Sequence, residues 1–91
     1  MADWNVLTKE PDGSPRIVEL DTGSLHIKVH RHIHERHDVW LLSVTGKVSL
    51  RNEKLLCRDL PSAQKEALRE LKELLHDLER EVYEAQKKQG G

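Results

Sequence analysis

The chain has 91 residues, in which 15 Lys and Arg face 16 Asp and Glu, for a formal net charge of −1. This length gives one domain with a modest core, too small for a barrel enzyme or a two-half nucleotide-binding fold. No apolar run approaches the roughly 20 residues that span a bilayer. The first residues lack the basic and apolar regions of a secretory signal. The single cysteine, Cys57, forbids an intramolecular disulfide. We therefore expect a cytoplasmic protein without membrane contact.

The chain divides into four predicted parts within one domain. Residues 1–15 are turn-like, with a short edge strand around Trp4, Val6 and Leu7, and residues 16–58 form a β-meander. Residues 59–88 form a long helix, and residues 89–91 form a frayed tail. The predicted class is α+β: an antiparallel meander of three to five strands packed by one C-terminal helix.

The longest predicted strand covers residues 24–34 and alternates strictly. Apolar side chains occupy most odd positions, with Arg31 as the exception: Leu25, Ile27, Val29 and Ile33. Polar side chains occupy the even positions: Ser24, His26, Lys28, His30, His32 and His34. This period predicts one face in the core and one in water. We expect the Arg31 stem to pack near the strand end with its charged head in solvent.

Two further segments complete the predicted sheet. Residues 39–44 are almost continuously apolar, which favours a strand covered on both faces, with Trp40 as its largest core candidate. Residues 47–50 and 54–58 form either two short strands around Asn52 or one bulged strand.

The predicted helix carries an apolar stripe that is longer than the sheet it would cover. About 25 residues make about 37 Å of helix, whereas three or four strands are about 15–20 Å across. The stripe continues through Leu78, Val82 and Ala85, so these side chains need another cover. We therefore expect a homodimer. The residues proposed for self-association are Leu71, Leu74, Leu78, Val82 and Tyr83. Leu71, Leu74 and Leu78 fit a coiled-coil spacing, which Glu81 interrupts.

The histidine-rich strand is the second candidate surface. Its predicted partner-binding residues are His26, Lys28, His30, His32, His34 and Arg36. The same face could contact phosphate, which makes a nucleic-acid-binding module the alternative function, although exposed aromatic residues for base stacking are scarce. His30 and His32 are spaced to share a metal ion. Such a site needs a third or fourth ligand, such as His37, Asp38 or Cys57, and no Cys-x-x-Cys or His-Glu-x-x-His spacing supports it. We expect no metal and no other cofactor.

Catalytic spacings are absent from the sequence. It contains no nucleophile elbow, no phosphate-binding glycine loop and no dinucleotide fingerprint. Cys57 is of a residue type that is more often a small buried apolar group than a nucleophile. The sequence therefore predicts a protein that is not an enzyme.

The segment GSLHIKVHRHIHERHDVWLLS, followed by CRDLPSAQKEAL, resembles small, uncharacterised proteins of bacterial and prophage genomes. The resemblance covers roughly residues 23–75. It implies a strand meander closed by one C-terminal helix, and it favours phage-borne roles such as a small inhibitor or adaptor. We expect a non-enzymatic protein that binds a protein partner of unknown identity.

Overall fold

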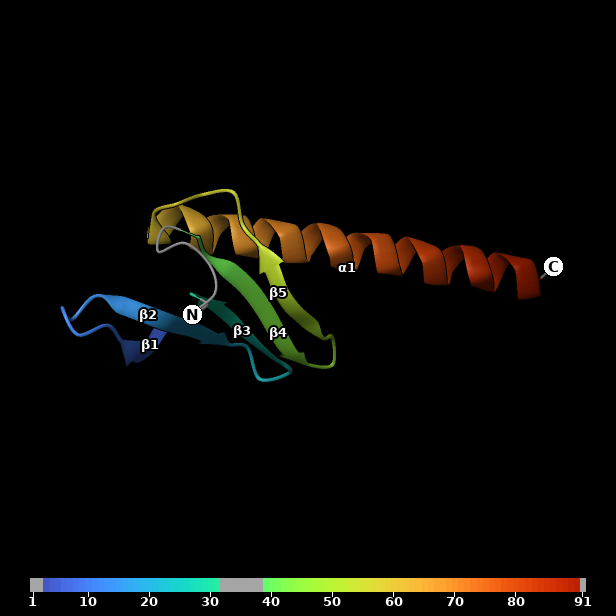
Figure 1. The fold of residues 1–91 in the computed structure, drawn as a ribbon. Helices are drawn as coiled ribbons and strands as arrows, with labels where there is room; N and C mark the ends of the chain where they lie inside the picture. The colour runs from blue at the N-terminus through green and yellow to red at the C-terminus, as the bar shows by residue number, and fades with distance from the viewer. Residues whose placement is uncertain (1–2, 32–38, 91) are drawn as a thin grey trace.

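The computed structural model describes residues 3–31 and 39–90 and shows a five-stranded antiparallel sheet with one long helix. The strands are β1 (Asn5–Lys9), β2 (Pro15–Asp21), β3 (Leu25–His30), β4 (Leu41–Gly46) and β5 (Leu50–Lys54), and they lie side by side in sequence order. The helix α1 (Leu60–Gly90) lies across one face of the sheet and continues far beyond it (Figure 1). The predicted α+β meander with a C-terminal helix is confirmed.

Strand pairing separates the two faces of the sheet. Val29 of β3 pairs with Val18 of β2 and Leu42 of β4, and Ile27 pairs with Leu20 and Val44. Directly paired residues share a face, so these side chains form one apolar layer, which α1 covers. The predicted alternation of β3 is confirmed for residues 25–30. The strand ends at His30 rather than His34, and residues 32–34 lie outside the described part of the chain.

The predicted segments at residues 47–50 and 54–58 are joined in one bulged strand, β5, and residues 47–49 and 55–58 are not strand. Leu42 pairs with Glu53 and Val44 with Leu50, so Ser43 alone stands opposite two residues of β5. Asn52 has a left-handed backbone with φ of 51°, and its N–H donates to the Ser43 hydroxyl at 3.1 Å. Asparagine tolerates this conformation better than most residues, which places the bulge at this position.

Two carboxylates shape the start of α1. Asp59 precedes the helix, and its Oδ2 accepts a hydrogen bond from the Ser62 N–H at 3.1 Å. Hydrogen bonds from the Ser62 hydroxyl and backbone lower the pKa of Asp59. About two turns after Asp59, the buried Glu66 reaches back to the preceding loop and accepts the N–H groups of Leu56 and Cys57 at 2.8–2.9 Å. The loop between β5 and α1 is therefore fixed by the helix itself.

Only the first part of α1 packs on the sheet. Its buried residues are Ala63, Glu66, Ala67 and Leu71, and Leu74 packs half-buried against the core. Every residue from Leu75 to Gly90 is exposed. The helix has 31 residues, or about 46 Å at 1.5 Å per residue. The molecule is correspondingly elongated, with extents of 60 × 26 × 19 Å.

Arg31 differs from its predicted environment. Its guanidinium carbon lies 4.6 Å from the centre of the Trp40 ring, and Nη1 lies 3.6 Å from the Glu10 carboxylate. The side chain is only 18% exposed. The expectation of a charged head in solvent is therefore wrong, because the aromatic face and Glu10 replace water around the cation. Trp40 is buried, as predicted, and its indole N–H donates to the Arg58 carbonyl at 2.7 Å.

Candidate functional site

The first candidate site is the polar face of the sheet, opposite α1. The even residues of β3, His26, Lys28 and His30, lie together there, as predicted, but each is half-buried rather than fully in water. Pairing with β2 adds Glu19 opposite Lys28 and Asp21 opposite His26. Sequence reasoning did not include these two carboxylates. The one signal in the sequence is Asp21-Thr22-Gly23, whose residue types are typical of a tight turn, since such a turn brings residue 21 close to residue 26.

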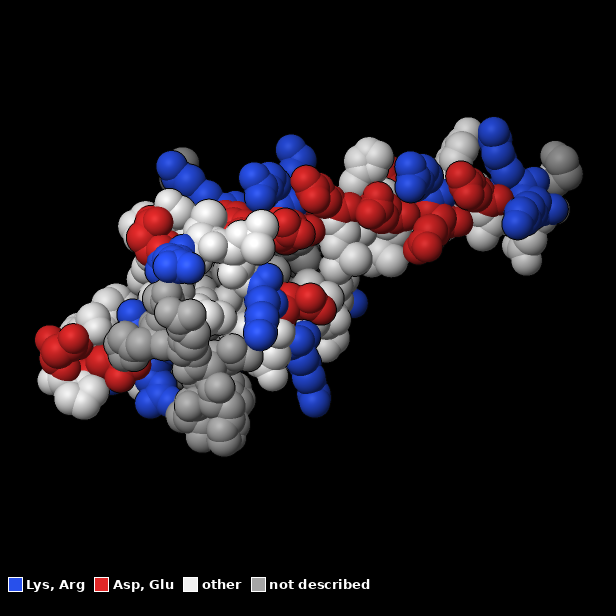
Figure 2. Space-filling model, turned by 45° about the horizontal axis from the view of Figure 1, so that its top comes forward, with Lys and Arg blue, Asp and Glu red and all other residues white. Residues whose placement is uncertain are grey.

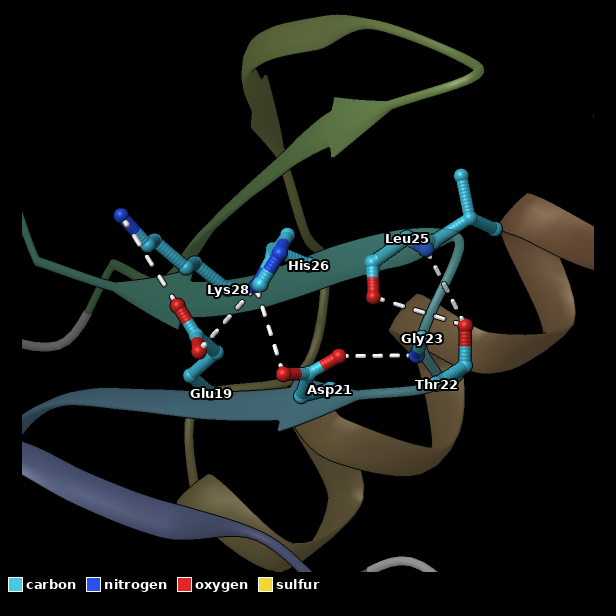
Figure 3. A network of polar contacts seen from close by, with 7 residues as sticks. All are labelled: Glu19, Asp21, Thr22, Gly23, Leu25, His26 and Lys28. Carbon is cyan, nitrogen blue, oxygen red and sulfur yellow. Dashed lines mark hydrogen bonds and ion pairs between the residues drawn. The ribbon is translucent and has the colours of Figure 1, made fainter.

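Glu19, Asp21 and His26 form a compact network at the end of the β2–β3 hairpin (Figure 3). His26 Nδ1 lies 3.4 Å from Glu19 Oε1 and 3.8 Å from Asp21 Oδ2, and Lys28 Nζ lies 4.0 Å from Glu19 Oε2. The other Asp21 oxygen accepts the Gly23 N–H at 2.8 Å and so holds the turn. This face therefore carries both signs of charge in close contact.

The same three residues each offer a ligand atom, and these atoms lie within 4.8 Å of one another. Carboxylate and imidazole groups at this spacing are of the type that binds a divalent cation. In Figure 3, both carboxylates are directed at the His26 ring. The side chains of His26 and Asp21 are 44% and 50% exposed, so solvent screens these pairs.

His30 is engaged in a chain of hydrogen bonds. His30 Nδ1 donates to the Arg31 carbonyl at 3.3 Å, because a carbonyl oxygen can only accept. His30 Nε2 forms a hydrogen bond with the Ser43 hydroxyl at 2.7 Å, and the Ser43 oxygen also accepts the Asn52 N–H at 3.1 Å. The imidazole thus fastens β3 to the bulge of β5. Three predicted residues of this surface, His32, His34 and Arg36, lie outside the described residues. The predicted metal pair of His30 and His32 is therefore described only at His30.

The second candidate site is the outer flank of α1. Its exposed stripe consists of Leu68, Leu75, Leu78 and Val82, which are 38%, 38%, 39% and 59% exposed. A shallow groove on this flank is lined by Leu68, Leu71, Lys72, Leu75, His76 and Glu79. Figure 2 shows acidic and basic side chains interleaved with uncharged ones along the part of the helix that leaves the sheet. A continuous apolar stripe in water is typical of an interaction surface.

The predicted self-association residues fall into two groups. Leu71 is only 4% exposed and Leu74 is half-buried, because both pack against the sheet. Leu78, Val82 and Tyr83 are exposed beyond it. Tyr83 lies beneath the Lys87 ammonium, whose nitrogen is 5.3 Å from the ring centre. The apolar stripe therefore extends beyond the sheet, as predicted. Leu75 belongs to its exposed part, whereas Leu74 packs against the core.

Glu66 and Cys57 are a pair of titratable side chains in contact with each other, apart from the two candidate surfaces. Burial alone would raise the pKa of Glu66, but the backbone N–H groups of Leu56 and Cys57, the Cys57 thiol and the Arg69 charge together lower it. The hydrogen bond to Glu66 and partial desolvation raise the pKa of Cys57. A thiol held protonated in this way is a weak nucleophile. The pair serves to fix the loop.

Comparison with known proteins adds no relative: no family model, no curated protein and no solved structure matches the chain. In residues 3–31 and 39–90, no helix combines the length and the apolar character needed to cross a bilayer. The assignment of function therefore rests on the two surfaces described above.

Proposed function

We propose that this protein is a non-enzymatic interaction protein that self-associates through the exposed stripe of α1. The observation that carries the proposal is the stripe itself, in which four large apolar side chains lie in water along about 21 Å of helix. Full burial of a fully exposed side chain of this size contributes about 1.5–3 kcal/mol. Because these four are 38–59% exposed, each gains roughly half of that or less, and the four together still give a net driving force for pairing.

The isolated helix gives a second argument for a partner. A segment of about 16 residues without tertiary contacts is a marginal helix in water. Residues 75–90 are nevertheless helical although none of them is buried. A partner on the stripe would supply the packing that the sheet does not.

The polar face remains the proposed surface for a different protein partner, through His26, Lys28 and His30. Nucleic acid is the less favoured occupant, because Lys28 and His26 lie within 4.0 Å of Glu19 and His26 also lies near Asp21. These carboxylates offset the positive potential that phosphate binding requires. A cytoplasmic, phage-borne adaptor or inhibitor role is part of the same proposal.

Sedimentation velocity over a wide range of protein concentration tests self-association. We expect the wild-type mass to rise from monomer to dimer, and Leu78→Glu to remain monomeric because a charge would be placed in the stripe. Glutamate is a good helix former, so α1 itself is retained. Leu7→Glu is the matched control, since Leu7 is 51% exposed but lies on β1. A wild-type protein that stays monomeric at high micromolar concentration would overturn the proposal.

A further inference from the structure

The spacing of the apolar residues on α1 defines the kind of partner that the stripe fits. Leu68, Leu71, Leu75, Leu78, Val82 and Ala85 follow one another at alternating intervals of three and four residues. This is the a/d repeat of a coiled coil, with Leu68, Leu75 and Val82 at position a. Leu71, at the first d position, is 4% exposed because it packs on the sheet, so the seam open to a partner consists of the other five residues. The continuation through Leu75 avoids the interruption at Glu81 that a repeat through Leu74 meets. The matching surface is another helix with the same repeat, and a second copy of this chain supplies one.

The charges beside this seam distinguish the two possible directions of pairing. Lys72 and Glu79 occupy the e positions, and both line the groove on the outer flank. Within the described part of the chain, neither forms an ion pair. In a parallel pair, an e residue faces a g residue of the preceding heptad. Lys72 would then face Ala67, and Glu79 would face Leu74, so neither charge would meet its opposite.

In an antiparallel pair, e residues face e residues of the partner helix. Lys72 of each copy then lies opposite Glu79 of the other, and the twofold axis produces this pair twice. In the same register, Leu75 of one copy packs on Leu78 of the other, and the large Leu68 meets the small Ala85. In this register the two sheets lie toward opposite ends of the helix pair, and residues 79–90 of one copy lie beside residues 63–74 of the other.

We infer that two copies of this protein pair their α1 helices antiparallel, with Lys72 of one copy facing Glu79 of the other. This inference rests on the proposed self-association and adds its geometry. It also explains why the stripe extends back to Leu68, over the part of α1 that already packs on the sheet. The end of the partner helix would cover Leu68, which lies beside the buried contact and is 38% exposed.

Charge reversal tests the geometry. Lys72→Glu places two glutamates at each facing pair, and Glu79→Lys places two lysines there. We expect each single variant to raise the dimer dissociation constant about tenfold, since two attractive pairs become two repulsive ones. The double variant restores opposite charges and should return the constant to within about twofold of wild type.

Mixing the two single variants gives the sharper result. A heterodimer of Lys72→Glu with Glu79→Lys has an attractive pair at both positions, so the mixture should dimerise more tightly than either variant alone. The matched control is a mixture of Glu73→Lys with Arg80→Glu, which makes the same charge changes at the f positions, on the side of α1 away from the seam. We expect no preference for the heterodimer in the control.

Sedimentation velocity with one variant fluorescently labelled measures both mixtures. Selective heterodimers of the seam variants, with none in the control, support the antiparallel pair. Equal behaviour of both mixtures overturns it, even if Leu78→Glu still abolishes dimerisation, and in that case the proposed function stands without this geometry. A monomeric wild-type protein overturns both.

Discussion

The two halves of α1 belong to one continuous helix but have different sources of stability. In residues 60–74, Ala63, Ala67 and Leu71 are buried against the sheet, and Glu66 anchors the preceding loop. In residues 75–90, no side chain is buried, although Leu75, Leu78 and Val82 carry the same apolar character. The difference shows that an amphipathic stripe does not by itself indicate what covers it. Small alanines allow close approach to the sheet, whereas the larger residues beyond it are not covered by any of residues 3–31 and 39–90.

Hydrogen exchange should give the largest difference between the halves. At a dilution where only monomer is present, backbone amides near Ala67 should exchange only through global unfolding, whereas those near Val82 exchange through local fraying. We expect protection factors to differ on the order of 10³-fold, given a typical domain stability of about 5 kcal/mol or more. Equal protection in both halves would show that the distal helix is held by contacts absent from this structure.

Truncation of one leucine in each half should separate folding from association. Leu71→Ala removes a side chain that is 4% exposed, and we expect a loss of about 2–4 kcal/mol in the free energy of unfolding. Leu78→Ala should change the same quantity by less than about 0.5 kcal/mol in dilute protein. Urea denaturation at low concentration measures both. Comparable losses would contradict the contrast between the halves.

Removal of the Glu66 carboxylate should loosen the proximal half. Glu66→Ala leaves the N–H groups of Leu56 and Cys57 without their acceptor, and we expect a loss on the order of 2–3 kcal/mol. The control is Glu70→Ala, which removes an exposed carboxylate one turn later. A loss in the control as large as that in Glu66→Ala would mean that charge on this helix, and not the loop contact, sets the stability.

The pH dependence of stability should follow the same carboxylate. The pKa of Glu66 is lowered in the folded state, so the folded state binds its proton less readily than the unfolded state. The contribution of Glu66 to the free energy of unfolding is complete above the ordinary Glu pKa of about 4.3. It is lost as the pH falls through the lower pKa that Glu66 has in the folded state. Denaturation between pH 7 and pH 3 should therefore show a steeper loss in wild type than in Glu66→Gln. Asp59→Asn is the control, because Asp59 accepts the Ser62 N–H at the start of α1 and its pKa is lowered as well.

The smallest effect is expected at the end of the distal half. Lys87→Gln removes the ammonium that lies 5.3 Å from the Tyr83 ring. An exposed contact of this kind contributes about 0.5 kcal/mol, so amide exchange near Tyr83 should accelerate roughly twofold. Amides near Ala67 should not change. A change there would indicate coupling between the two halves along the helix.

The sequence predicted the features that depend on local periodicity. The alternation of Leu25, Ile27 and Val29 located the core face of β3, and the three- and four-residue spacing located α1 and its overhang. The choice between two strands and one bulged strand at Asn52 could not be made, because it depends on the pairing with β4. In β-sheets, register rather than composition determines which side chains meet.

The contacts that sequence missed join distant segments. Arg31 lies over Trp40 and near Glu10, and His26 meets Glu19 and Asp21 of the neighbouring strand. Glu66 resembles any other charged residue of a solvated helix, yet it is buried because two backbone N–H groups approach it from a loop ten residues earlier. Pattern analysis cannot distinguish such a residue from its exposed neighbours Lys65 and Glu70.

The irregular outer strands have a consequence for how copies of this protein can meet. The sheet is open at both ends, and an open end can recruit another chain and propagate into a fibre. β5 departs from regular pairing at Asn52 and exposes Arg51, Glu53 and Lys54, while β1 has register shifts on either side of Thr8. These distortions oppose end-to-end polymerisation of sheets. The twofold α1 contact proposed above differs from such growth, because it closes after two copies.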